Sequence, residues 1–217
     1  RIGRALMCGI AGAVDLSDKR TFPAPRLAAM GLAIQHRGPD EAGSFIEPGV
    51  ALHNQRLSIV DLESGSQPIY NEDDTVVAVL NGEIFNHLEL RKELEKKGHR
   101  FRTSTDTEVL VHLWEEHGRS LVDHLEGQFA LAVYDRKAQR LLLARDPFGV
   151  CPLFIHRTPD GWLLFASEVK ALLASGLLDA ELDPRGVDHI FTFFAMGTRR
   201  TMFRGVESLP QGHALTV

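Results

Sequence analysis

Cysteine is scarce in this chain, since only Cys8 and Cys151 occur among its 217 residues. They form no Cys-x-x-Cys pair and no disulfide framework, so we expect a reducing compartment, the cytoplasm, and a separate explanation for each thiol. A chain of this length can bury roughly 70% of its unfolded surface. It therefore needs neither disulfides nor a metal ion to hold its fold together.

The chain also has no large excess of positive or negative charge. Lys and Arg number 24 against 29 Asp and Glu, which leaves a net charge of -5 and argues against a protein that binds nucleic acid by neutralising phosphates. No apolar stretch approaches the roughly 18 residues needed to cross a bilayer. Residues 1–7 also lack the apolar core of a signal peptide. We therefore expect a chain that binds neither nucleic acid nor membrane.

Several familiar functional motifs are absent as well. The sequence has no Gly-x-Gly-x-x-Gly, no P-loop and no Gly-x-Ser-x-Gly, so nucleotide binding and a serine-hydrolase elbow have no motif support. Ten histidines are present, but none has His-Glu-x-x-His spacing, and His112 and His117 would project about 140° apart on a helix. The sequence predicts no metal site and no cofactor for this part of the protein.

Apolar patterns are the main structural signal in the sequence. They predict strands at residues 8–15, 76–80, 129–135, 140–145, 162–166 and 213–217, and helices at 25–35, 86–98, 105–118, 167–175 and from 184 onward. The strand at 76–80 is expected to stop at Asn81-Gly82-Glu83. Because the strands come in hairpin-spaced groups with helices between the groups, an α+β fold is favoured over an alternating parallel one.

The start of the chain offers the first chemical hypothesis. Met7 precedes a small residue and is of the kind that is commonly trimmed, which would leave Cys8 with both its thiol and the free α-amine of the chain. A thiol with a pKa of about 8.5 is mostly protonated at pH 7, and an α-amine with a pKa of about 7.7–8.0 can accept its proton. Cys8 would then be nucleophile and base at once. The simpler interpretation is a small buried strand residue.

Further blocks follow Cys8 in order: His-Arg-Gly-Pro-Asp at 36–40, Arg-Leu-Ser-Ile-Val-Asp at 56–61, Asn-Gly-Glu at 81–83, Ser-Thr-Asp-Thr-Glu at 104–108, Arg-Asp-Pro-Phe-Gly at 145–149 and Leu-Pro-Gln-Gly-His at 209–213. Together they resemble the glutaminase domain of class II, N-terminal-nucleophile glutamine amidotransferases, in the asparagine synthetase branch. The resemblance spans residues 7–217. It implies an αββα sandwich of two antiparallel sheets over 8–217, with 1–7 as an expression remnant, an upstream stretch or a pro-segment.

The resemblance also implies the catalytic residues. Cys8 would attack the side-chain amide of glutamine. Asn81, through its side chain, and Gly82, through its backbone N–H, would form the oxyanion hole. From the residues alone, Asn81-Gly82 could equally be an ordinary turn.

Four further residues match substrate-binding positions of the same family. Arg56 would pair with the α-carboxylate of glutamine, because a guanidinium can make two bonds to it, and Val60 would line the pocket. Glu83 and Asp106 would hold the α-ammonium. Without the family, Asp106 could simply cap a helix and Arg56 could be a surface charge.

The implied activity is hydrolysis of L-glutamine to glutamate and ammonia. Relatives use the ammonia in a C-terminal synthetase domain of the same polypeptide, which adenylates an acceptor such as aspartate with ATP and magnesium. We therefore expect a domain of a longer chain, and leave a homodimer open. Two alternatives remain: a catalytically silent partner domain of a synthetase, and a glutaminase that feeds an acceptor other than aspartate.

Overall fold

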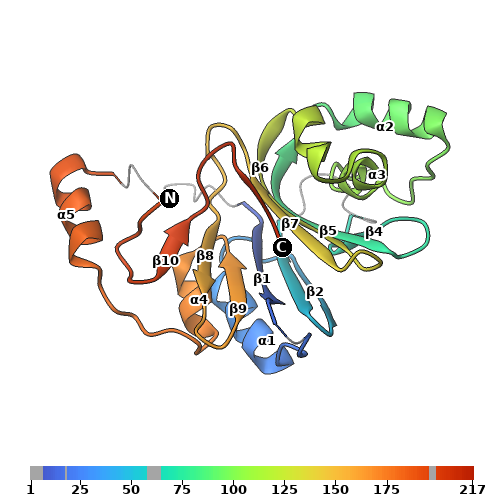
Figure 1. The fold of residues 1–217 in the computed structure, drawn as a ribbon. Coiled ribbons are helices and arrows are strands. Elements are labelled where there is room, and N and C mark those ends of the chain that lie inside the picture. The colour runs from blue at the N-terminus through green and yellow to red at the C-terminus, as the bar shows by residue number, and fades with distance from the viewer. Residues whose placement is uncertain (1–6, 18, 58–64, 196–198) are drawn as a thin grey trace.

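The structure, a computed structural model, describes residues 7–17, 19–57, 65–195 and 199–217. Its strands form two antiparallel sheets, ordered β10-β8-β9-β1-β3-β2 and β11-β7-β6-β5-β4 (Figure 1). The first sheet contains β1 (Gly9–Asp15), β2 (Glu41–Glu47), β3 (Val50–Arg56), β8 (Phe154–Arg157), β9 (Trp162–Ala166) and β10 (Val206–Ser208). The second contains β4 (Ile69–Tyr70), β5 (Val76–Ile84), β6 (Gly127–Asp135), β7 (Arg140–Arg145) and β11 (Ala214–Thr216).

Helices cover the outer face of each sheet, as Figure 1 shows. Helices α1 (Ala24–Ala33) and α4 (Val169–Ala174) pack on the first sheet, and α2 (His87–Lys97) and α3 (Glu108–His117) pack on the second. A 3-10 helix, Gly118–His124, follows α3, and α5 (Pro184–Phe193) lies apart from both sheets. The result is the αββα sandwich that the sequence predicts.

The alternation of side chains along β5 explains the layers. Val77 and Val79 point inward and join a core cluster with residues of the first sheet, while Ala78 and Leu80 point outward into the cluster that includes α2 and α3. Successive side chains of a strand lie on opposite faces. The centre of each sheet therefore buries both faces, which is why β5 is continuously apolar from Val76 to Leu80.

Strand β5 is longer than predicted. Instead of stopping at 81–83 it continues to Ile84, with Asn81 opposite Ala130 and Gly82 opposite Phe129. Gly82 makes this continuation possible, because its φ is 134° and a Cβ there would lie 2.0 Å from the carbonyl oxygen of Gln128. The interpretation of Asn81-Gly82 as an ordinary turn is therefore wrong.

The predicted helices form at the expected places, with one difference in detail. Asn86 occupies the N-cap position of α2 but does not cap it. Its side chain instead accepts a hydrogen bond from the N–H of Glu126 (3.0 Å) and donates to the carbonyl of His124 (2.9 Å). Asp183 does cap α5, accepting from the N–H of Arg185 at 3.0 Å.

The block at 145–149 is structural. The buried carboxylate of Asp146 accepts hydrogen bonds from the backbone N–H groups of Phe148, Val150 and Cys151, each at 3.0 Å. The Arg145 guanidinium donates to backbone carbonyls on both sides of the same turn and beyond it. These bonds fix the exit from β7.

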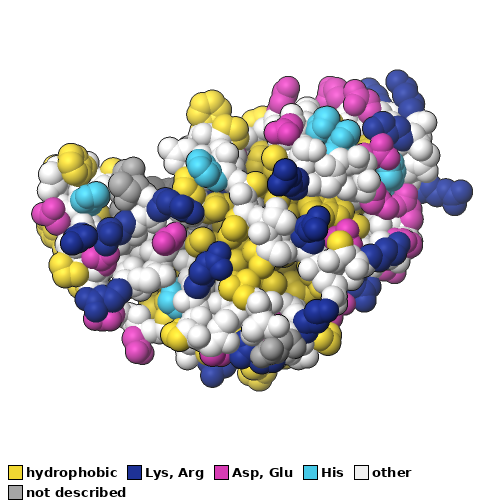
Figure 2. Space-filling view, viewed as in Figure 1, with side chains coloured by type: hydrophobic (Ala, Val, Ile, Leu, Met, Phe, Trp, Pro, Cys, Tyr) yellow, Lys and Arg dark blue, Asp and Glu magenta, His cyan; other side chains and the backbone are white. Residues whose placement is uncertain are grey.

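The outer surface carries mixed charge. Figure 2 shows basic and acidic side chains interspersed over one face of the molecule, with hydrophobic side chains gathered in its middle. Among the described residues, every helix is too short or too polar to cross a membrane. Around the end of α5, Phe191, Phe193 and Phe194 are largely exposed.

Candidate active site

Cys8 lies directly before β1, the strand between β3 and β9 in the first sheet. Its carbonyl oxygen accepts a hydrogen bond from Nε of Arg37 at 2.9 Å, and Arg37 is itself paired with Glu168 at 3.1 Å. The next contact along the strand is the N–H of Ile10, which donates to Oγ of Ser167 at 2.9 Å. These bonds fix the backbone that presents the thiol.

The thiol of Cys8 is only partly buried and faces a backbone segment of the same sheet. The N–H of Leu57 donates to its sulfur at 3.4 Å, and the thiol donates to the Leu57 carbonyl at 3.6 Å. Burial raises the pKa of the Cys8 thiol, although the Leu57 N–H and the charge of Arg56 oppose this rise. The thiol is therefore protonated at neutral pH and requires a base before it can act as a nucleophile.

A cavity of about 90 Å³ lies beside this thiol. Its lining residues come from six segments of the chain: Met7, Cys8, Arg56, Leu57, Gln67, Gly82, Glu83, Thr105, Asp106, Thr107 and Gln128. The structure thus brings together five of the seven predicted site residues. Asn81 is not among the lining residues, and Val60 lies outside the described part of the chain.

Arg56 is the last residue of β3, and it is 3% exposed, so its interpretation as a surface charge is wrong. Its Nη1 lies 2.8 Å from Oε2 of Glu41, which also accepts from the hydroxyl of Ser66 at 3.0 Å. The hydrogen bond from Arg56 is the main reason why the pKa of Glu41 is lowered. The guanidinium is therefore held in place at the wall of the cavity.

The two carboxylates at the cavity differ in environment. Asp106 is 5% exposed, and its Oδ2 accepts from the N–H of Ile84 at 2.9 Å. It does not cap α3, whose N-cap position is Thr107; instead it ties the segment before α3 to the end of β5. Glu83 is exposed, so its side chain can reorient toward a ligand.

Asn81 is fully buried in β5, and neither its Oδ1 nor its Nδ2 has a hydrogen-bond partner. An unpaired buried amide normally costs about 1–3 kcal/mol. Native proteins keep few such groups, and functional sites account for a share of them. Next to Gly82, whose backbone reaches the cavity, this amide is a donor without an intramolecular acceptor.

Sequence reasoning missed several residues of the site. Arg37, which holds the Cys8 carbonyl, stands in the quoted block at 36–40, so that block carried the signal. Gln67 and Thr107 line the cavity and bond one another at 3.2 Å, and Gln67 also accepts from the N–H of Leu80 at 2.7 Å. Thr107 stands in the quoted block at 104–108, whereas Gln67 stands out neither by spacing nor by chemistry in the sequence.

A larger hollow of about 640 Å³ lies elsewhere, along α5 and the residues that follow it. Asp183, Arg185 and His189 contribute to its lining, but no thiol and no other activated nucleophile does. Size alone therefore does not make it the better candidate for bond-breaking chemistry.

The chain is similar to several known proteins. The chain is 39% identical over 216 residues to asparagine synthetase [glutamine-hydrolyzing] 3 of Bacillus subtilis, covering 97% of this chain and 34% of the relative. It is 43% identical over 166 residues to asparagine synthetase [glutamine-hydrolyzing] 2 of Oryza sativa subsp. japonica, covering 76% and 28%. The chain thus spans about a third, or less, of the length of these relatives.

Solved structures show the same fold. A glutamine phosphoribosylpyrophosphate amidotransferase from B. subtilis superposes with a TM-score of 0.59 at 24% identity, covering 78% of this chain and 44% of that one. A structure described as the allosteric regulatory enzyme of purine biosynthesis gives 0.62 at 23% identity, covering 78% and 43%. A family model described as a glutamine amidotransferase domain matches residues 7–217. The chain therefore belongs to the glutamine amidotransferase domain family.

Proposed function

We propose that this domain hydrolyses L-glutamine, with Cys8 as the nucleophile. The observation that carries the proposal is the convergence at one cavity of a thiol, a buried guanidinium and two carboxylates, contributed by Cys8, Arg56, Glu83 and Asp106. These groups complement the side-chain amide, the α-carboxylate and the α-ammonium of glutamine respectively. Ion pairs of this kind orient a small zwitterion as well as bind it.

The proposed chemistry follows from the state of the thiol. Because burial raises the pKa of Cys8, a base must remove its proton, and the free α-amine of a chain that begins at Cys8 supplies one. The sulfur then attacks the amide carbon. The amide N of Asn81 and the N–H of Gly82 stabilise the oxyanion. The α-ammonium returns the proton to the leaving nitrogen, ammonia departs, and water hydrolyses the thioester to glutamate.

Met7 has a direct bearing on this mechanism. It lines the cavity together with Cys8 and packs against the inner core. While it remains attached, the nitrogen of Cys8 is an amide without basicity, and the Met7 side chain takes space at the cavity. Removal of the residues before Cys8 therefore both creates the base and enlarges the site.

For the full-length protein we propose a synthetase domain C-terminal to this one that uses the ammonia to make asparagine from aspartate, with ATP and magnesium. The support is the similarity to glutamine-hydrolysing asparagine synthetases, of which this chain covers 28% and 34%. A cytoplasmic location fits its two free thiols. A silent partner domain has no need of a cavity that still collects Cys8, Arg56 and Asp106.

The test is glutamate release by purified protein that begins at Cys8, compared with its Cys8→Ala variant. We expect the variant to lose hydrolysis, and to lose labelling by an electrophilic glutamine analogue, because the covalent intermediate cannot form. Circular dichroism should show that the variant remains folded. Substantial glutamate release by Cys8→Ala would contradict the assignment.

A further inference from the structure

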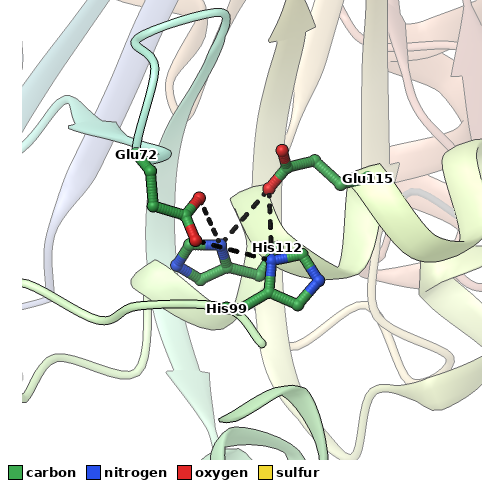
Figure 3. Close-up of side chains that lie close together, drawn as sticks. All are labelled: Glu72, His99, His112 and Glu115. Atoms are coloured by element: carbon green, nitrogen blue, oxygen red, sulfur yellow. Dashed lines mark hydrogen bonds and ion pairs between the residues drawn. The ribbon is translucent and has the colours of Figure 1, made fainter. Parts of the chain in front are cut away.

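Four side chains on the side of the molecule covered by α2 and α3 lie close together: Glu72, His99, His112 and Glu115. Glu72 stands in the turn between β4 and β5, His99 follows α2, and the other two lie on α3. Figure 3 shows the side chains pointing toward one another from these three elements. His112 is completely buried, and the imidazole of His99 is largely so.

One ligand atom of each residue can be chosen so that all four atoms lie within 4.8 Å of one another. Nδ1 of His112 lies 3.4 Å from Glu72 Oε2 and 3.3 Å from Glu115 Oε2. Nδ1 of His99 lies 3.7 Å from Glu72 Oε1 and 3.6 Å from the same Glu115 oxygen. Charge-assisted hydrogen bonds are shorter, about 2.7–2.9 Å. A tetrahedral Zn²⁺ ion with ligand distances of about 2.0–2.2 Å places its ligand atoms roughly 3.3–3.6 Å apart.

The second nitrogen of each histidine faces a carboxylate outside the cluster. Nε2 of His99 lies 3.1 Å from Glu116 Oε1, and a carboxylate can only accept, so this nitrogen carries the proton. Nε2 of His112 faces Glu108 Oε1 at 3.8 Å, and Glu108 is held as a carboxylate by the N–H groups of Arg102 and Thr103. Nδ1 of both rings points the other way, toward carboxylate oxygens of Glu72 and Glu115, and Nδ1 of His112 lies within hydrogen-bond distance of Glu115, at 3.3 Å. Ligand atoms of all four residues thus face a common centre.

The carboxylates are oriented in the same way. Glu72 Oε1 accepts from the N–H of Arg100 at 2.8 Å, and Glu115 Oε1 accepts from the side-chain amide of Asn71 at 3.0 Å. Metal ligands in proteins characteristically have such outer partners, which set ring tautomer and carboxylate direction. Oε2 of Glu115 thus remains directed at both histidines, and Oε2 of Glu72 remains directed at His112, while Oε1 of Glu72 lies 3.7 Å from His99.

We propose that Glu72, His99, His112 and Glu115 bind one Zn²⁺ ion in a tetrahedral structural site. Two neutral imidazoles and two carboxylates balance the charge of a divalent cation, and imidazole nitrogen with carboxylate oxygen is a donor set that zinc accepts. Four protein ligands close the coordination shell, so the ion has no open position for substrate. Its effect is to join the β4–β5 turn and the end of α2 to α3.

The test uses protein without an affinity tag, stripped by a chelator and titrated with zinc chloride against a competing fluorescent chelator. We expect one equivalent to bind and the melting temperature to rise with it. Cobalt added in place of zinc should give the visible absorption of a tetrahedral site. The same stoichiometry should persist in Cys8→Ser, which excludes the thiol of the other site as the ligand.

Substitutions test whether these residues are the ones that bind zinc. Glu115→Gln changes a partly exposed ligand and should weaken zinc binding by more than about 100-fold, because even outer partners such as Glu116 typically contribute about 10–100-fold. Glu93→Gln, the same change at an exposed position of α2, should bind zinc as the parent does. The alternative is a cluster held by protonated histidines. The proposal would be overturned, and this alternative favoured, if the parent did not bind one equivalent of zinc or if the parent and Glu115→Gln bound zinc with equal affinity.

Discussion

The two polar sites lie toward opposite ends of α3 and differ in how their groups are satisfied. At its start, Asp106 and Thr107 line the cavity beside Cys8 together with the exposed Glu83, and the amide of Asn81, which precedes Gly82 in β5, has no partner. Further along, Glu72, His99 and Glu115 of the cluster each have an outer hydrogen-bond partner, and Nε2 of His112 faces Glu108 at 3.8 Å. Open hydrogen-bonding capacity suits a substrate that comes and goes, whereas a closed set suits an ion that stays.

The largest effect is expected from a change that acts only on the cavity beside Cys8. Protein that begins at Cys8 should hydrolyse glutamine about 10²–10⁴ times faster than protein that begins at Arg1, the usual value of a general base. Both forms should bind zinc equally, since the cluster is far along α3 from Cys8. Glutamate release, with mass spectrometry of each terminus, checks the prediction. Equal rates would show that the α-amine is not the base.

The next effect tests the unpaired amide. Asn81→Ala should lower kcat by about 10²–10³ if the amide donates to the oxyanion, with glutamine binding little changed. Glu115→Gln, by contrast, should leave kcat close to that of the parent while losing zinc. If kcat is unchanged in Asn81→Ala, the buried amide of Asn81 does not stabilise the oxyanion. The measurements are steady-state kinetics and the amount of bound zinc for each variant.

The two sites also differ in how far the sequence predicts them. The cavity residues stand in short blocks with recognisable order, so Cys8, Arg56 and Asp106 could be named and the αββα layers expected. The ligands of the cluster could not be predicted, because they come from three segments of the chain. The two that share α3 are His112 and Glu115, whereas the pair considered from the sequence is His112 and His117. Tertiary packing alone decides that Glu72 and His99 join them.

Strand β3 shows why the prediction of the fold was incomplete. It ends in His53, Asn54, Gln55 and Arg56, four polar residues that are all buried. Burial of polar side chains in a strand erases the apolar signal from which strands are predicted. The side-chain nitrogen of Asn54 donates to the Leu80 carbonyl at 3.1 Å, across the two sheets, while its Oδ1 has no partner among the described residues. Such compensation is visible only once the sheets are packed.

A smaller effect is expected at the carboxylate-binding side of the cavity. Arg56→Ala should raise KM about 10- to 100-fold with a modest change in kcat, because a charged hydrogen bond present in both ground and transition states is worth about 1.5–3 kcal/mol. Its loss also leaves Glu41 without its partner. Glu41→Gln is the matched control, since it keeps the guanidinium and should move KM less. A fall in kcat alone for Arg56→Ala would place this residue at the reacting amide.

The smallest effect on turnover is expected at the second thiol. Cys151 is fully buried, and burial raises its pKa to about 12, so almost no thiolate exists there at pH 8. Cys151→Ser should leave turnover close to that of the parent.

In the folded parent, iodoacetamide should label Cys8 alone. Because burial also raises the Cys8 pKa, labelling at the amide-linked terminus should still be increasing at pH 9, following the thiolate fraction. Peptide mapping after labelling at each pH provides the measurement. Modification of Cys151 at a similar rate would mean that the inner core opens readily, and the contrast between an accessible thiol and a buried one would fail.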